Sequence, residues 1–190
     1  MLAAPPGLST RPTSDRLRET LFNVLAPRIA GAFFLDLYAG SGAVGIEALS
    51  RGAESVTFVE RSPAAIRTLR SNLERLGVDG GFRIHSGGVE AYLRTSVKAG
   101  PKRERHEVLF MDPPYEEEQE YVATLGLLGG PAAALLAPGA VVIAEHRRKL
   151  PLDEQYGGLR RTRQLEQGDA ALSFYAISTE PLDPSSTRDS

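Results

Sequence analysis

The distribution of hydrophobic and polar residues predicts strands and helices that alternate along most of the chain. Short apolar runs, typical of buried strands, occupy residues 32–37, 55–60, 82–86, 107–111 and 139–145. Between them, apolar residues recur at helical spacing and predict helices over 43–51, 63–76, 89–97 and 117–129. A further helix, capped by Thr13 or Ser14, precedes the first strand. This order predicts a doubly wound α/β fold with a mostly parallel sheet, whose ligands lie at the carboxyl ends of the strands.

The carboxyl-terminal part of the chain departs from this alternation. Residues 159–167 and 170–178 read as two strands joined at Gly168-Asp169, which predicts an antiparallel hairpin. We expect one domain over residues 13–178, preceded by a short arm over 1–12. Residues 179–190 are rich in Ser, Pro and Asp, so we expect a disordered tail.

Composition narrows the class of protein. A chain of 190 residues is long enough for one α/β domain with a sizeable core. The absence of cysteine excludes a disulfide framework and a cysteine-rich zinc site. His85, His106 and His146 show no ligand spacing, so no metal site is expected. No run of about 18 apolar residues and no leader-like segment occurs, which favours a soluble, cytoplasmic protein without a membrane contact.

Charge is distributed unevenly. The net charge of −2 does not by itself indicate a nucleic-acid-binding protein. Basic residues nevertheless cluster near the amino terminus, over 98–106 and over 145–163. Such clusters are commonly solvated surface charge, but they can also hold a phosphate backbone. The acidic run 116–118 suits the beginning of the helix predicted after it.

A glycine-rich segment follows the first predicted strand. Gly40, Gly42 and Gly45 satisfy the pattern G-x-G-x-x-G and open the helix over 43–51. Glu60 ends the second predicted strand, where its carboxylate can accept both ribose hydroxyls of an adenosine. The spacing fits NAD and S-adenosylmethionine equally, so this motif predicts an adenosine-containing cofactor and no more.

The tetrapeptide Asp112-Pro113-Pro114-Tyr115 directly follows the apolar run 108–111. Prolines donate no amide hydrogen and stiffen the backbone, so the carbonyls there remain free as acceptors. Asp112 adds a carboxylate acceptor, and Tyr115 adds a flat face on which a base can stack. This edge therefore suits a planar amine such as the exocyclic amine of a purine.

Several segments together resemble the bacterial small-subunit rRNA guanine-N2 methyltransferases of the RsmD type, which are class I methyltransferases. The segments are 10–23 (TRPTSDRLRETLFN), 36–42 (DLYAGSG), 47–52 (EALSRG) and 112–115 (DPPY). The first segment is the one that points to this family, and the resemblance covers about residues 3–178. It implies a seven-stranded sheet, S-adenosyl-L-methionine as methyl donor, and a guanine of 16S rRNA, naked or in the small ribosomal subunit, as acceptor.

The resemblance also implies roles for individual residues. Asp36 steadies the glycine loop and the methionine ammonium, Glu60 holds the ribose, and Arg61 lies beside the adenine. The expected cofactor-binding residues are Asp36, Tyr38, Ala39, Gly40, Ser41, Gly42, Glu60, Arg61, Gly88 and Val89. The expected catalytic residues are Asp112, Pro113, Pro114 and Tyr115. Contacts to RNA are expected from Arg11, Thr13, Arg16, Arg18, Arg147 and Arg148.

Three departures from the family pattern stand out. The family usually begins with a basic strand, and this sequence starts just after it, so we expect either that the recorded start is too late or that an RNA-contacting element is missing. The adenine-contacting position, often acidic in relatives, falls at Gly88 or Val89, so only main-chain contacts remain there. The turn before the last strand reads Gln167-Gly168-Asp169-Ala170, without the aromatic residue that relatives often carry.

Three other functions stay open. A DNA adenine-N6 methyltransferase uses the same amine chemistry but usually adds a target-recognition region, for which this chain has no room. An NAD-dependent oxidoreductase explains the glycines and Glu60 but leaves residues 112–115 without a task. A non-catalytic RNA-binding module is the third alternative. We expect a monomer, because no exposed apolar helix stripe is evident.

Overall fold

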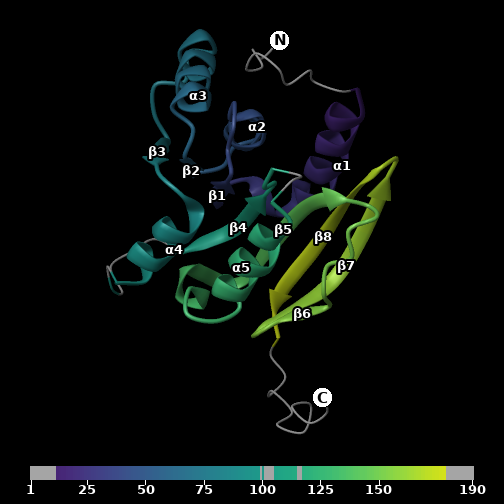
Figure 1. Cartoon of the computed structure of the whole chain (residues 1–190). Helices are drawn as coiled ribbons and strands as arrows, with labels where there is room; N and C mark the ends of the chain where they lie inside the picture. The colour runs from purple at the N-terminus through teal and green to yellow at the C-terminus, as the bar shows by residue number, and fades with distance from the viewer. Residues whose placement is uncertain (1–11, 99, 101–104, 115–116, 179–190) are drawn as a thin grey trace, which may run out of the picture.

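The computed structural model describes residues 12–98, 100, 105–114 and 117–178, which form one mixed sheet flanked by helices (Figure 1). The strand order is β3-β2-β1-β4-β5-β8-β7-β6. The first five strands in that order run parallel, and the last three join them in antiparallel fashion. The elements are α1 (Pro12–Ile29), β1 (Phe33–Leu37), α2 (Ala43–Ser50), β2 (Ser55–Glu60), α3 (Pro63–Arg75), β3 (Phe82–Ser86), α4 (Val89–Lys98), β4 (His106–Met111), α5 (Gln119–Leu128), η1 (Ala133–Leu135), β5 (Leu136–Arg147), β6 (Gln155–Tyr156), β7 (Leu159–Gln167) and β8 (Ala170–Ile177).

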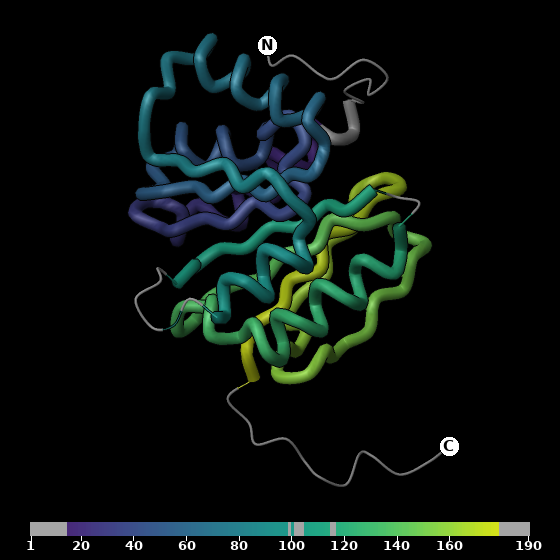
Figure 2. The backbone as a smooth tube through the Cα atoms, turned by 60° about the vertical axis from the view of Figure 1, so that its left-hand side comes forward, coloured from purple at the N-terminus to yellow at the C-terminus, as the bar shows by residue number. Residues whose placement is uncertain are grey.

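Helices cover both faces of the sheet because the central strands are apolar on both faces. Phe34, Val108 and Ile143 face one side and pack with buried residues of α1, α2 and α3. Residues one position further along each strand face the other side and pack against α4 and α5. Figure 2 shows α4 and α5 side by side across the strands. Runs of buried side chains on both faces are typical of parallel strands under two helical layers.

Helix α3 begins where its sequence predicts. In α3, Ser62 precedes the helix and its hydroxyl accepts a hydrogen bond from the amide of Ala65 at 3.3 Å, while Pro63 occupies the first position. Ile66, Leu69 and Leu73 form the buried stripe of the helix. The cap and the apolar spacing together fix α3 over β2 and β3.

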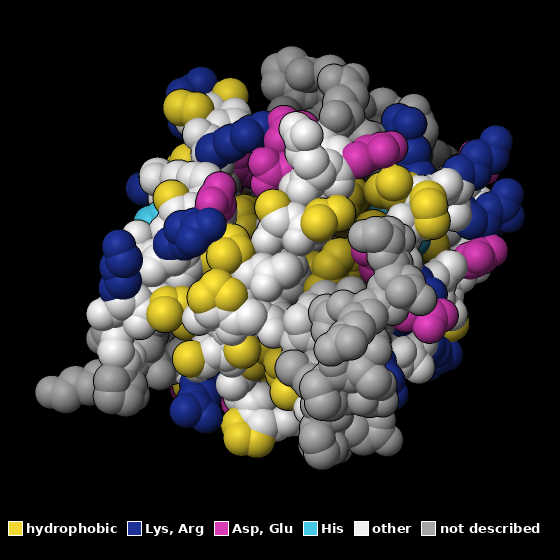
Figure 3. Space-filling view, turned by 60° about the horizontal axis from the view of Figure 1, so that its bottom comes forward, with side chains coloured by type: hydrophobic (Ala, Val, Ile, Leu, Met, Phe, Trp, Pro, Cys, Tyr) yellow, Lys and Arg dark blue, Asp and Glu magenta, His cyan; other side chains and the backbone are white. Residues whose placement is uncertain are grey.

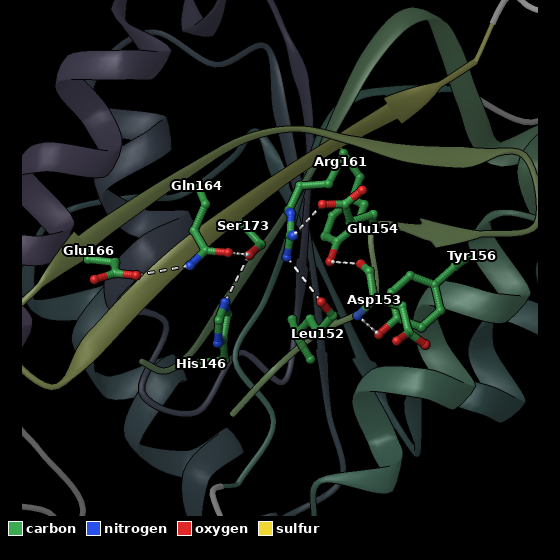
Figure 4. A network of polar contacts seen from close by, with 10 residues as sticks. His146, Leu152, Asp153, Glu154, Tyr156, Arg161, Gln164, Glu166 and Ser173 are labelled. Carbon is green, nitrogen blue, oxygen red and sulfur yellow. Dashed lines mark hydrogen bonds and ion pairs between the residues drawn. The ribbon is translucent and has the colours of Figure 1, made fainter. Parts of the chain in front are cut away.

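The carboxyl-terminal hairpin is fastened to the sheet by a buried polar network (Figure 4). The Nε2 atom of His146 lies 2.9 Å from the hydroxyl oxygen of Ser173, and its Nδ1 atom lies 2.9 Å from the carbonyl oxygen of Arg147. Arg161 donates to the carbonyl oxygen of Leu152 at 3.0 Å. Burial lowers the pKa of His146, so its neutral form satisfies both contacts.

Two glycines bring the end of α5 against the chain beside β6. The amide of Gly158 donates to the carbonyl oxygen of Gly129 at 2.6 Å. A Cβ atom at Gly129 would lie 1.7 Å from the carbonyl oxygen of Tyr156, and one at Gly157 would lie 2.5 Å from the carbonyl oxygen of Gly129. The approach of these two backbones therefore leaves no space for a side chain.

The predicted fold class is confirmed, with differences in detail. All seven predicted strands are present, and the eighth, β6, is a two-residue strand that pairs only with β7. Helix α1 begins at Pro12, ahead of the predicted cap at Thr13 or Ser14, and β5 begins at Leu136 instead of residue 139. The proposed arm falls almost entirely outside the described residues, and so does the tail over 179–190.

Candidate active site

The carboxyl end of β1 leads directly into the glycine loop. Asp36 lies in this strand with 2% of its surface exposed. Its carboxylate accepts a hydrogen bond from the amide of Gly45, in the first turn of α2, at 2.9 Å. Gly42, the residue before α2, offers no side chain for this purpose, so Asp36 caps the helix from the neighbouring strand. This bond couples β1 to the start of α2 behind the loop, and the role of Asp36 toward the methionine ammonium remains a prediction.

Close packing explains the glycines of the loop. Gly42 adopts φ +81°, and a Cβ atom there would lie 2.2 Å from Cδ1 of Leu69. A Cβ atom at Gly45 would lie 2.3 Å from the ring of Phe58. The loop therefore lies directly on α3 and β2. Asn72 of α3 adds a side-chain hydrogen bond to the carbonyl oxygen of Ser41 at 3.0 Å.

Glu60 fastens the other side of the loop. One carboxylate oxygen accepts from the amide of Gly40 at 2.8 Å, and the other accepts from the amide of Ser62 at 2.7 Å. The amide of Ala39 donates to the carbonyl oxygen of Val59 at 3.0 Å. Each carboxylate oxygen has two lone-pair sites, so Glu60 retains acceptor capacity for ribose hydroxyls. The sequence predicted the ribose role and did not foresee the two backbone contacts.

Tyr38 connects the loop to α5. Its backbone has φ +65°, an uncommon conformation for a residue other than glycine. Its hydroxyl donates to the carboxylate of Glu120 at 2.7 Å and lies 2.8 Å from the hydroxyl of Thr124. The two contacts at the hydroxyl hold the side chain and so stabilise a strained backbone position, which is common beside functional sites.

Arg61 forms an ion pair with Glu117, which follows the Asp112-Pro113-Pro114 segment. This contact joins the end of β2 to the chain after β4. We predicted that the acidic residues 116–118 begin a helix. In the structure α5 begins at Gln119, and Glu117 instead pairs with Arg61. The predicted position of Arg61 beside an adenine remains a prediction.

Asp112 begins the segment that follows β4, at the same edge of the sheet. Pro113 is buried, whereas Pro114 is exposed and its carbonyl oxygen accepts from the amide of Glu117 at 2.9 Å. Tyr115 lies outside the described residues. Because β4 neighbours β1, Asp112 lies at the edge where β1 continues into the glycine loop.

Several carboxyl groups meet at this edge. Burial, opposed by the hydrogen bond from Gly45 and aided by the charges of Asp112 and Glu60, raises the pKa of Asp36 to about 7. Burial also raises the pKa of Asp112. Glu145, near the end of β5, has a raised pKa for the same reason, with Asp112 adding to the effect and Arg18 opposing it. An edge that brings the buried Asp36 together with the half-buried Glu60, Asp112 and Glu145 favours a cationic ligand.

The remaining predicted residues lie around this edge. The carbonyl oxygen of Gly88 accepts from the amide of Tyr92 at 3.0 Å, and the buried Val89 begins α4 directly after β3. Thr13, Arg16 and Arg18 lie in α1, and Arg147 and Arg148 are exposed at the end of β5. Arg11 lies outside the described residues.

Arginine is distributed over several surfaces. Arg18 donates to Asp15 at 2.9 Å. On the face shown in Figure 3, Lys and Arg side chains are scattered, and acidic side chains lie among them. The described residues drawn there form no continuous basic surface.

The sequence analysis missed Glu145. It also missed the hydrogen bond from Tyr38 to Glu120 of α5 and the ion pair of Arg61 with Glu117, just before α5. Glu145 directly follows a strongly apolar run, as Asp112 does, and this shared position was a usable signal. Within the described part of the chain, no helix has the length and apolar character needed to span a bilayer. No group of three His, Asp or Glu side chains there is arranged to hold a metal ion.

Comparison with known proteins identifies the family. The model of the family described as "Conserved hypothetical protein 95" matches residues 1–176. The chain belongs to this family. A Bacillus subtilis relative of this family member, named "Putative rRNA methyltransferase YlbH", is 38% identical over 174 residues, which cover 92% of this chain and 91% of the relative. Ribosomal RNA small subunit methyltransferase D of Escherichia coli is 43% identical over 114 residues, covering 60% of this chain and 54% of that protein.

A solved structure agrees with this assignment. "Putative methyltransferase yhhF" from Escherichia coli superimposes on this member of the family with a TM-score of 0.76 and 35% sequence identity. The superposition covers 94% of this chain and 92% of the other. The predicted resemblance to the RsmD type and the predicted class I methyltransferase fold are therefore confirmed.

Proposed function

We propose that this protein transfers a methyl group from S-adenosyl-L-methionine to the exocyclic N2 amine of a guanine in 16S rRNA. The observation that carries the proposal is the adjacency of β1 and β4, which brings the glycine loop and Asp112 to one edge of the sheet. Membership of the family supports it, as does the identity to relatives named as rRNA methyltransferases.

The charge of the site fits the cofactor. The buried carboxyl of Asp36 is influenced by Asp112 and Glu60, both acidic, and by the amide of Gly45. The ammonium and sulfonium of S-adenosylmethionine would supply positive charge to these carboxylates. The pyrophosphate of NAD carries negative charge and would be repelled by them, so the acidic edge argues against the oxidoreductase alternative.

Each residue at the edge has a distinct task in the proposed reaction. Bound S-adenosylmethionine supplies a methyl group already activated on sulfur. Asp36 binds the methionine ammonium, and Glu60 binds the ribose while holding the amide of Gly40. Main-chain groups at Gly88 and Val89 contact the adenine. With the loop fixed on α3, the methyl group is held in one orientation, which is the main requirement for this type of transfer.

Asp112 and the carbonyl oxygen of Pro113 accept the hydrogens of the guanine amine. This favours a more pyramidal nitrogen, whose lone pair attacks the methyl carbon as the bond to sulfur breaks. The nitrogen then loses one proton, and Asp112 takes it, directly or through water. A raised pKa suits this role, because the carboxyl can accept a proton near neutral pH. Tyr115 stacks on the base after it leaves its local fold.

The wider substrate follows from the same reasoning. Thr13, Arg16 and Arg18 lie in α1 and border the RNA in this proposal, together with Arg11, Arg147 and Arg148. We take the small ribosomal subunit particle as the partner, the cytoplasm as the place of reaction, and a monomer as the acting form.

The decisive test is transfer of labelled methyl from S-adenosylmethionine to small ribosomal subunits that lack their modifications. Naked 16S rRNA and duplex DNA serve as competing acceptors, and Asp112→Ala serves as the blank. We expect label on the N2 atom of a single guanine, and none with the Asp112→Ala variant.

Each alternative predicts a different result. Equal labelling of duplex DNA would favour the DNA adenine methyltransferase. Stabilisation by NADH and not by S-adenosylhomocysteine would favour the oxidoreductase. RNA binding without turnover would favour the non-catalytic module.

A further inference from the structure

Glu145 lies directly beside Asp112 on the neighbouring strand. The register of β4 and β5 pairs Phe110 with Ile143 and Met111 with Ala144 at the end of β4, and one residue further along each chain come Asp112 and Glu145, whose charges interact. Neighbouring strands lie about 4.8 Å apart. Phe110 and Ile143 pack on the face covered by α1, and alternation along each strand directs Asp112 and Glu145 to that same face.

The surroundings of Glu145 supply charge but no hydrogen-bond donor. Among the described residues, its carboxylate accepts no hydrogen bond, although the residue is half-buried. Arg18 of α1 attracts the carboxylate, but the hydrogen bond that Arg18 makes goes to Asp15. The strand end is held firmly, because Tyr121 donates to the main-chain oxygen of Glu145 at 2.8 Å. A half-buried carboxylate to which no described side chain donates keeps its acceptor sites available to a ligand that supplies a donor.

Strand order indicates which part of a substrate would reach this carboxylate. The glycine loop follows β1, Asp112 follows β4, and Glu145 lies in β5, so the three occupy successive positions along one edge. In the proposed reaction the amine nitrogen lies between the methyl group and Asp112. The part of the base next to the amine then extends past Asp112 toward β5.

The base edges of purines differ at this position. In guanine the ring nitrogen N1 beside the N2 amine carries a hydrogen and is a donor. In adenine the ring nitrogen beside the N6 amine carries a lone pair and is an acceptor. An ionised carboxylate attracts the first and repels the second, and the positive charges of Arg18 and of the bound cofactor favour this ionised form of Glu145. The same Asp112 chemistry serves both amines, so selection has to come from a neighbouring group.

We infer that Glu145 accepts a hydrogen bond from the N1–H of the target guanine and so selects guanine over bases that lack this donor. The inference rests on the proposed function and assigns a specificity-determining residue to it. Glu145 forms no bond to the methyl group. It also takes no proton from the amine, because accepting that proton is the role of Asp112.

The test uses 2-aminopurine, which keeps the amine at C2 but has a lone pair in place of N1–H. Small subunits are reconstituted from rRNA that carries guanine or 2-aminopurine at the position that the wild-type protein labels. Methyl transfer is measured for the wild type, Glu145→Gln and Glu54→Gln. Glu54 is an exposed acid at the opposite edge of the sheet and serves as the matched control.

We expect the wild type and Glu54→Gln to prefer guanine, and Glu145→Gln to lose roughly 10- to 100-fold in kcat/KM on guanine. Its rate on 2-aminopurine should not fall, so the ratio between the two substrates should approach one. Unfolding midpoint and S-adenosylhomocysteine affinity of Glu145→Gln should match those of the control.

The remaining outcomes separate the inference from the proposed function. If Glu145→Gln lowers kcat/KM equally on both substrates, the role of Glu145 is merely structural and the inference is overturned. An unchanged preference for guanine would overturn it as well, with the proposed function intact. If the wild type labels no guanine N2 in any RNA, the proposed function fails and the inference fails with it.

Discussion

Replacement of Gly42 by alanine tests whether the glycine loop depends on its contact with α3. Gly42 has φ +81°, which costs an alanine about 1–2 kcal/mol. The new Cβ atom would lie 2.2 Å from Cδ1 of Leu69 and 3.2 Å from Cδ1 of Ile46. Leu69 is fully buried, so it yields only by disturbing its neighbours, and such overpacking costs about 1–3 kcal/mol. We expect Gly42→Ala to lower the free energy of unfolding by about 2–5 kcal/mol.

The matched control is Gly77→Ala, at the end of α3. Gly77 has φ +68°, but a Cβ atom there meets nothing within 4 Å. The control therefore carries the backbone cost of about 1–2 kcal/mol without the overpacking. Urea unfolding gives both values, and calorimetric titration with S-adenosylhomocysteine reports on the loop. Only Gly42→Ala should also weaken the binding of S-adenosylhomocysteine.

An equal loss of stability in the two variants would refute the reasoning, because it would mean that Leu69 moves aside without cost. Unchanged ligand affinity in Gly42→Ala would separately refute the claim that this contact positions the loop.

Further predictions follow from the carboxyl groups and from Tyr38. Asp36 has a pKa raised from 3.8 to about 7 in the folded state, so the folded protein favours the protonated form. Stability should therefore fall as the pH rises from about 4 to about 7, by roughly 4 kcal/mol from this group. The difference in unfolding free energy between the wild type and Asp36→Asn should change over this window, and a constant difference would contradict the assignment. The rate of methyl transfer should decline as the pH falls through the pKa of Asp112, because burial raises this pKa above the usual range of a carboxyl. A rate that stays unchanged down to pH 5 would argue against an ionised Asp112. Glu60→Gln should weaken the binding of S-adenosylhomocysteine by about 1–3 kcal/mol in calorimetric titration, whereas Glu54→Gln should leave this affinity unchanged. Tyr38→Phe should lower the unfolding free energy by about 1–2 kcal/mol, because Glu120 loses its donor; the same midpoint as the wild type in urea would show that this contact is dispensable.

Local patterns in the sequence were sufficient for most of the fold. The apolar runs and the spacing of Ile66, Leu69 and Leu73 depend only on neighbouring residues, and so do the caps of α3. Strand β6 escaped prediction because two residues carry no period, and this strand forms only by pairing with β7. The positive φ of Tyr38 escaped for a similar reason, because Glu120 and Thr124 stabilise it from far along the chain.

The candidate site divides in the same way. Asp36, Glu60 and Asp112 each end or nearly end an apolar run, so the sequence alone predicts that they meet at one edge. Glu145 also follows an apolar run, but its place beside Asp112 depends on β5 lying next to β4. No local pattern carries that information, because strand order is decided by how the whole sheet packs.

The contact between Gly129 and Gly157 has a consequence for sequence variation. A substitution at either position would have to be accompanied by a different ending of α5 or a different path into β7, since neither backbone leaves space for a side chain. We therefore expect the two glycines, 28 positions apart, to vary together among related sequences. Their joint presence in an unfamiliar sequence would indicate a hairpin closed in this manner, and the loss of one would predict the loss of the other.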